Sequence, residues 1–334
     1  MRDKGLLFLA GVLCATLGLP MRLLATGSER SLDQLLQAAT AARLSGHYAQ
    51  AGELYTFAIR DLEAVGITDV RLARSLLDLG GVREVQGRCQ QAADLVLRGL
   101  RILEAADQPD PFARSEAWQE LGKAYYCQRQ YSKADQALHR ALGIEQSTPA
   151  PRQDRLAEIL ASQGGVYEFE GRFAEAETAF ERAQSIIDQN PRADSMDAAF
   201  LRNNLGMLFR MMGRNAESEA AFLGGLALAE AATTPNPVME IALLDNLASL
   251  DLARKQYRDA AARFERALRL LDRGTPLLPR AAGQILRDYA ACLRKLGDRS
   301  RARTLNTRAA ALLSSQEDGN GRLVVDVTEL AQAK

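Results

Sequence analysis

The sequence predicts an all-α solenoid of about seven helix–turn–helix units, because one short turn motif recurs along nearly the whole chain. Its copies are separated once by 41 residues and five times by 42 residues. They begin at Gly46, Gly87, Arg129, Gly171, Gly213, Lys255 and Gly297. A fixed period of about 20 to 50 residues is typical of solenoids, in which each unit contacts only its neighbours.

The third unit shows the two helices of a repeat most clearly. Trp118, Leu121 and Tyr125 follow one another at three- and four-residue steps, which is the pattern of an amphipathic helix. The turn at Arg129 interrupts it. A second apolar stripe follows at Tyr131, Ala134, Leu138 and Ala141.

At two equivalent positions of each unit, one in each helix, the side chains have a similar size from unit to unit. The middle of each first helix never carries a residue larger than alanine: Ala39, Gly80, Gly122, Gly164, Gly206, Ala248 and Ala290. The second helix carries a bulky column: Tyr55, Val96, Leu138, Phe180, Phe222 and Phe264. Since glycine lowers helix propensity, its recurrence at one phase indicates that the paired helices cross closely. The seventh unit has Asn306 in the bulky column, as expected of a terminal unit.

The prolines indicate the same division of the chain. Of the ten prolines, nine follow residue 27, and all nine fall between the predicted helix pairs. Proline is disfavoured inside a helix but tolerated in loops and first turns. The predicted units therefore span about 31–66, 69–107, 112–148, 152–190, 194–232, 236–274 and 277–316, which gives fourteen helices.

The pattern Trp118-x-x-Leu121-Gly122-x-x-Tyr125, followed by Ala134, Leu138 and Ala141, resembles the tetratricopeptide (TPR) repeat. The resemblance covers about residues 31–316. The usual TPR period is about 34 residues, and the longer unit is similar to that of kinesin light chains and their bacterial relatives. The elements Leu201–Gly206 and Leu243–Ala248 resemble the Asn-Leu-Ala/Gly element of that subfamily.

The resemblance implies a right-handed superhelix whose concave wall is lined by the first helix of each unit. It also implies that extended peptides bind there, held by Asn amides and by Lys or Arg. The expected groove residues are Gln119, Lys123, Tyr126, Glu168, Asn203, Asn204, Arg210, Asp245, Asn246, Arg287 and Arg294. Asn204 and Asn246 have an alternative, structural role, in which they bond the backbone of the neighbouring repeat. The first two units offer a more apolar floor at Leu36, Leu77 and Gly81.

The charge balance excludes some classes of partner. The 334-residue chain has 42 basic and 42 acidic side chains, so it has no general electrostatic reason to bind nucleic acid or an anionic membrane. Residues 278–316 are an exception, with eight basic and two acidic side chains. This excess is either the solvent face of an end-capping helix pair, which we favour, or a docking end for an acidic partner.

The two ends of the chain differ from the repeats. Arg2 and Lys4 precede an apolar stretch over residues 5–19, and Ala25-Thr26-Gly27 offers a small-residue cleavage site. We therefore predict that residues 1–27 are a signal peptide and that the protein is exported to the periplasm or cell envelope; the alternative is an uncleaved anchor at residues 5–25. Residues 317–334 form a C-terminal tail that is either strand-like or irregular.

Four cysteines are present, and Cys14 lies in the signal segment. Cys89 and Cys127 fall near the same edge of adjacent units, so a bridge between them is one alternative. We favour the other, in which Cys89, Cys127 and Cys292 are all small apolar fillers.

No catalytic, cofactor or metal motif is present. The two histidines lie in different repeats, and no Gly-x-Gly-x-x-Gly, Gly-x-Ser-x-Gly or Cys-x-x-Cys occurs. The spacing of Glu116 and Glu120 is explained by solvation of a helix surface. The sequence therefore predicts a non-enzymatic adaptor that binds a protein or an extended, acidic peptide segment. The alternatives are a self-associating scaffold and a membrane-tethered or cytoplasmic regulatory protein.

Overall fold

The computed structural model describes residues 29–107, 110–189, 195–233, 235–275 and 277–314, and these ranges contain fourteen helices and no strand. The first four pairs are α2 (Glu29–Leu44) with α3 (Tyr48–Ala64), α4 (Val70–Val85) with α5 (Cys89–Glu104), α6 (Pro111–Cys127) with α7 (Tyr131–Gln146), and α8 (Gln153–Phe169) with α9 (Phe173–Gln189). The last three are α10 (Ser195–Met211) with α11 (Asn215–Ala231), α12 (Pro237–Ala253) with α13 (Tyr257–Asp272), and α14 (Pro279–Lys295) with α15 (Arg299–Ser314). The predicted all-α solenoid of seven helix pairs is confirmed.

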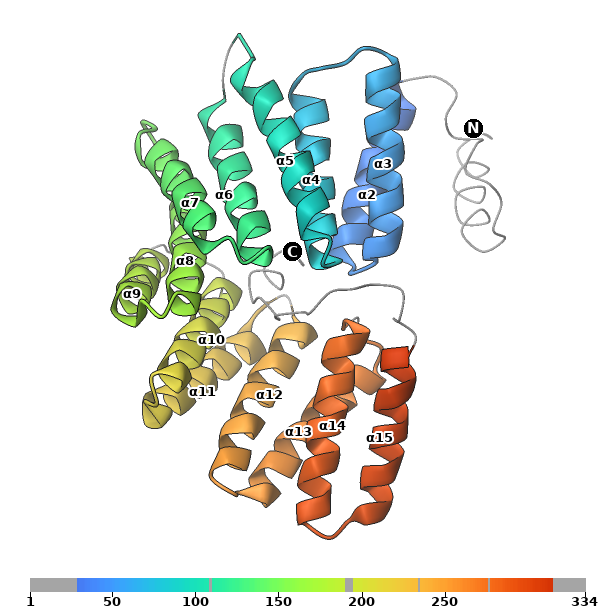
Figure 1. Ribbon diagram of the computed structural model, residues 1–334, viewed down its shortest axis with the longest axis vertical. Helices are drawn as coiled ribbons and strands as arrows, with labels where there is room; N and C mark the ends of the chain where they lie inside the picture. Colours follow the sequence, from blue (N-terminus) through green and yellow to red (C-terminus); the bar gives the residue numbers. More distant parts are fainter. Residues whose placement is uncertain (1–28, 108–109, 190–194, 234, 276, 315–334) are drawn as a thin grey trace, which may run out of the picture.

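The seven units follow one another along an arc, from α2–α3 to α14–α15 (Figure 1). Neighbouring units meet partly through their first helices, as α4 does with α6, α6 with α8, α8 with α10, and α10 with α12. In a curved stack, helices that approach their counterparts in the next unit lie on the inner side of the curve. We call the surface of α2, α4, α6, α8, α10, α12 and α14 on that side the inner face.

The turn inside each unit uses one backbone conformation. Residues at the seven turn positions all have positive φ: 73° to 76° at Gly46, Gly87, Gly171 and Gly213, 90° at Gly297, 60° at Arg129 and 61° at Lys255. The backbone N–H of Gln130 donates to Tyr125 O (2.9 Å) and that of Arg129 to Tyr126 O (2.8 Å). These two hydrogen bonds close the C-terminal end of α6, after which the chain reverses its direction. The turn therefore requires a left-handed residue even where the sequence does not supply glycine.

The small column of the first helix packs against the bulky column of the second. A Cβ built on Gly164 would lie 2.5 Å from the ring of Phe180, and one built on Gly206 would lie 2.5 Å from the ring of Phe222. Both phenylalanine side chains are fully buried. Glycine is retained at these positions because any larger residue would collide with the partner helix.

Neighbouring units meet at a seam, by which we mean the contact between one unit and the next. Along it, the C-terminal end of a first helix lies beside the start of the preceding second helix. Gln86 Nε2 donates to Tyr48 O (3.0 Å), and one unit later Gln128 Nε2 donates to Cys89 O (3.1 Å). The seam therefore repeats its contacts with the period of the chain.

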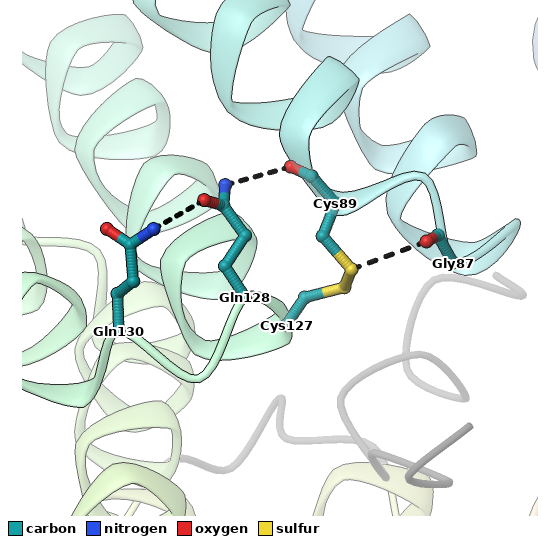
Figure 2. Close-up of a disulfide and its surroundings, with 5 residues drawn as sticks. All are labelled: Gly87, Cys89, Cys127, Gln128 and Gln130. Atoms are coloured by element: carbon teal, nitrogen blue, oxygen red, sulfur yellow. Dashed lines mark hydrogen bonds between the residues drawn. A yellow bond between two sulfur atoms is a disulfide. The ribbon is translucent and has the colours of Figure 1, made fainter. Parts of the chain in front are cut away.

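A disulfide joins Cys89, the first residue of α5, to Cys127, the last residue of α6 (Figure 2). Their Cα atoms are 5.6 Å apart, within the range that a bridge spans without backbone movement. The favoured expectation that all three cysteines are apolar fillers was wrong for this pair. It holds for Cys292, which is buried and donates to Tyr257 O at 3.0 Å.

Ion pairs also cross the seams on the side of the second helices. Arg172 pairs with Asp135 (3.6 Å) and Arg214 with Glu177 (2.8 Å), each reaching back by one unit. In the last unit, Arg301 pairs with Glu265 (3.6 Å) and Arg308 with Asp272 (2.6 Å). Part of the basic excess of the last unit is therefore used in contacts with the sixth.

The predicted signal segment and the C-terminal tail lie outside the described residues. Within the described ranges, none of the helices combines the length and the apolar character that crossing a membrane would require.

Candidate functional site

The eleven predicted groove residues differ widely in exposure. Gln119, Lys123, Glu168 and Asn203 are buried, with 1%, 8%, 4% and 0% of their surface exposed. Tyr126, Asn204, Arg210, Asp245 and Asn246 are partly exposed, and Arg287 and Arg294 are exposed. The buried residues differ from the expectation that all eleven side chains lie open on the inner face.

Asn203 and Asn246 form a contact between units. The Nδ2 of Asn246 on α12 donates to Oδ1 of Asn203 on α10, at 2.9 Å. Nδ2 of Asn203 lies 3.6 Å from Sδ of Met207 in its own helix. The side chain of Asn203 therefore bonds within the protein. The structural alternative for Asn246 applies, although the partner of Asn246 is the side chain of Asn203 and not the backbone of the neighbouring repeat.

Asp245 occupies an unfavourable place for an ionised carboxyl. Its Oδ1 is buried and has no hydrogen-bond partner in the described part of the chain. Burial, together with the charge of Asp288, raises the pKa of Asp245 to about 7, although Arg210 opposes the shift. The carboxyl is therefore partly protonated near neutral pH.

A network of charged side chains that sequence reasoning missed covers the inner face of the first four units. Four ion pairs belong to it: Arg43–Asp78 (3.9 Å), Arg74–Glu116 (3.7 Å), Lys123–Glu120 (2.9 Å) and Arg155–Glu158 (2.8 Å). Burial raises the pKa of Asp78 to about 6, with Arg43 opposing the shift. Burial also disfavours the charged form of Lys123, but Glu120 and Glu84 outweigh it and raise the pKa of Lys123.

This network corrects two expectations. Leu77 and Gly81 are buried, so they do not form an apolar floor in the second unit. Glu116 and Glu120 take part in ion pairs and are not merely solvated helix surface. One trace of the network in the sequence is that the 42-residue step places two of its acids, Asp78 and Glu120, in one column with Asn204 and Asn246. The step does not show which side chains pair.

The inner face of the last three units has a different character. No acidic oxygen of the described residues lies within 4.0 Å of Arg210, Arg287 or Arg294. Arg210 and Arg294 hold the same register position two units apart, and Arg287 lies two helical turns before Arg294 on α14. We call these three guanidinium groups the cation row.

Tyr126 belongs to an aromatic cluster at the end of α6. Its ring meets that of Phe169 edge-on at 5.3 Å and that of Tyr131 at 5.9 Å. Phe200, an aromatic residue of α10, is buried in the core. Within the described ranges, no three His, Cys, Asp or Glu side chains are grouped so that they could hold a metal ion.

The arc of helix pairs and its polar inner face define a helical-repeat protein with an extended inner surface. Residues 114–189 and 197–273 match the model of the tetratricopeptide repeat. These two segments therefore carry tetratricopeptide repeats, as the sequence pattern indicated. No curated protein sequence matches it.

Several solved structures share the fold. BtubC (BKLC) from P. vanneervenii is 21% identical and has a TM-score of 0.59, with 72% of this chain and 96% of that chain covered. A Rap protein complexed with Competence and Sporulation Factor is 15% identical, with a TM-score of 0.61 and coverage of 90% and 76%. The Rap conjugation gene regulator of plasmid pLS20, in complex with the Phr* peptide, is 16% identical, with a TM-score of 0.58 and coverage of 84% and 73%.

Proposed function

We propose that this protein is a non-enzymatic adaptor that binds an extended, acidic segment of a partner protein along the inner face of units five to seven. The observation that carries the proposal is the cation row. In the first four units the inner-face cations Arg43, Arg74, Lys123 and Arg155 each have a carboxylate within 4.0 Å. In the last three units Arg210, Arg287 and Arg294 have none among the described residues.

Arginine suits this role because its planar guanidinium can bind a carboxylate through two parallel hydrogen bonds. The chain itself uses that geometry elsewhere: Arg152 binds Glu145 through Nε and Nη2, both at 3.1 Å. Two of the similar structures are Rap proteins, one in complex with the Phr* peptide and one with Competence and Sporulation Factor. They support binding by this kind of fold, while the residues involved are argued from this chain alone.

We further propose that the protein acts in the periplasm or elsewhere in the cell envelope. The N-terminal sequence pattern supports export, and the Cys89–Cys127 bridge supports an oxidising compartment, since structural disulfides are rare in the cytosol. Fractionation tests this location. We expect an envelope protein whose mass lacks residues 1–27, whereas a full-length chain in the membrane fraction would favour the anchor at residues 5–25.

Removal of the cation row tests the binding face. The variant Arg210→Gln/Arg287→Gln/Arg294→Gln is compared with Arg258→Gln/Arg269→Gln/Arg273→Gln, which removes three exposed arginines from the region of α13. The full chain serves as bait for envelope extracts, and a captured partner is then titrated against each variant. We expect the first variant to lose about tenfold or more in affinity and the second to bind like the wild type.

The salt dependence of the same titration tests the acidic character of the partner. Affinity that rests on exposed charge pairs falls as ionic strength rises, because exposed charges are screened. A partner that both variants retain equally, with little salt dependence, would place binding away from the cation row.

A further inference from the structure

Two positions on the inner face carry asparagines in units five and six but aspartates in units six and seven. Asn203 of α10 and Asn246 of α12 are joined by a hydrogen bond across 43 residues of sequence. One unit later, the same two register positions are Asp245 of α12 and Asp288 of α14. Aspartate has the size and shape of asparagine. The register positions that hold an amide pair between units five and six therefore hold two carboxyls, Asp245 and Asp288, in units six and seven.

The surroundings of Asp245 supply no counter-charge at contact distance. Its Oδ1 is buried without a hydrogen-bond partner, and no Lys or Arg nitrogen of the described residues lies within 4.0 Å of its carboxyl group. The charged groups that act on it are Asp288 from α14 and Arg210 from α10. From α11 and α13, which also pack against α12, no charged group contributes in the described ranges.

Asp288 is held on its own helix. Both of its carboxyl oxygens accept from Gln284 Nε2, at 3.0 Å each, and Arg287 is the charged group that favours its ionised form. The two most deeply buried acids of the described residues are each paired with arginine: Glu145 with Arg152 (3.1 Å) and Asp251 with Arg263 (3.0 Å). For Asp245, in contrast, the charged group with the largest effect is an acid, Asp288.

Two ionised carboxylates are acceptors only, so they cannot bond each other. A single proton shared between them supplies an O–H donor and removes one of the two like charges. The protonated pair can then form the contact that the amides form between units five and six.

We propose that Asp245 and Asp288 form a proton-dependent contact between the last two units, which is closed while one carboxyl is protonated. Loss of that proton sets two negative charges against each other, loosens the seventh unit on the sixth and weakens the binding of an acidic segment to the cation row. The last consequence rests on the proposed function; the contact itself does not.

The direction of the pH dependence follows from the raised pKa of Asp245. A carboxyl whose pKa in the folded protein lies above its unfolded value of about 4 stabilises the fold while it is protonated. That contribution is lost as pH rises through about 7. Between about pH 6 and about pH 8, the opening equilibrium of the last unit changes by about tenfold for one such group.

Hydrogen exchange of the full chain tests the contact without any ligand. Amides of α14 and α15 are measured at about pH 6 and about pH 8, after correction for the intrinsic pH dependence of exchange. We expect about tenfold faster opening at the higher pH in the wild type. In Asp245→Asn, the new amide can donate to Asp288, so protection should not change with pH. Asp259→Asn, an exposed change on α13, is the matched control and should behave as the wild type.

Either of two results would overturn the contact: wild-type protection that does not change with pH, or a pH dependence that persists in Asp245→Asn. If Asp245→Asn failed to fold, Asp288→Asn would provide the same test, since its amide can donate to Asp245.

A second measurement tests the link to binding. The probe is a blocked, fluorescent decapeptide of alternating Glu and Ser, titrated at constant ionic strength; its carboxyls are ionised at both pH values. We expect its affinity to fall by roughly two- to fivefold from about pH 6 to about pH 8 in the wild type, and not in Asp245→Asn. Equal affinity at both pH values would overturn the link. A decapeptide that binds at neither pH would count against the proposed acidic ligand, and therefore against the link, while the exchange measurement still decides the contact.

Discussion

The side chain of Asn246 donates a hydrogen bond of 2.9 Å to the side chain of Asn203, which ties the first helices of units five and six together. Asn203 is fully buried, whereas Asn246 is partly exposed. The bond therefore satisfies a polar group that water does not reach. Its position on the inner face also means that a substitution there changes the scaffold as well as the surface.

We expect Asn246→Ala to destabilise the protein by about 1–3 kcal/mol, because it leaves the buried carbonyl of Asn203 without a donor. Asn203→Ala leaves only a partly exposed amide, which water can satisfy, so it should cost less. Urea unfolding of both single variants and of the double variant forms a cycle. Strictly additive effects would show that the hydrogen bond contributes nothing measurable.

Helix pairs and their packing could be predicted because their signals are local and repeated. The predicted unit 236–274 corresponds to α12–α13 at Pro237–Asp272, since Pro237 begins the first helix and the turn at Lys255 follows it. The close helix crossing at Gly164 could be predicted because glycine that recurs at the same helix position in successive units usually marks a close approach of two helices. Such features depend on residues within one unit.

The buried state of Asn203 could not be read in the same way. Adjacent residues on a helix point about 100° apart, so whether Asn203 or Asn204 faces the next unit depends on the rotation of α10 against α12. The charged network on the first four units depends on the same rotations. Residue type and spacing alone do not fix them, which is why Arg43 and Asp78 were not identified as neighbours.

The Cys89–Cys127 bridge should stabilise units two and three. A bridge that closes a sequence separation of 38 residues contributes roughly 3–4 kcal/mol in the chain-entropy model, and often less in practice. We expect Cys89→Ala/Cys127→Ala to increase hydrogen exchange in α5 and α6 more than in α12 and α13, because a solenoid transmits stability mainly to neighbouring units.

A reducing agent supplies the control for this prediction. It should reproduce the exchange of the Cys89→Ala/Cys127→Ala variant in the wild type, and it should leave the variant itself unchanged. Wild-type exchange that does not respond to complete reduction would show that the bridge adds no stability.

The close crossing at Gly164 predicts an unusual response to alanine. Alanine normally stabilises a helix relative to glycine by up to about 1 kcal/mol. At Gly164, however, the added methyl group would lie 2.5 Å from the ring of Phe180, so we expect a net loss of about 1–3 kcal/mol. The neighbouring Gly165→Ala is the matched control, since nothing lies within 4 Å of its Cβ position, and it should stabilise the protein. Thermal unfolding that ranks the two variants in the opposite order would contradict the packing argument.

The turns at Arg129 and Lys255 predict that glycine is the better residue there. Both have φ near 60°, a conformation that costs a residue with a side chain about 1–2 kcal/mol relative to glycine. Glycine also gains entropy in the unfolded chain, which offsets part of that advantage. Since both side chains are exposed, we expect Arg129→Gly and Lys255→Gly each to stabilise the protein by about 0.5–1 kcal/mol in urea unfolding. The reverse change, Gly213→Ala, should destabilise by a similar amount. If glycine lowered stability at both turns, Arg129 and Lys255 would have to make contacts that outweigh the strain of their backbone.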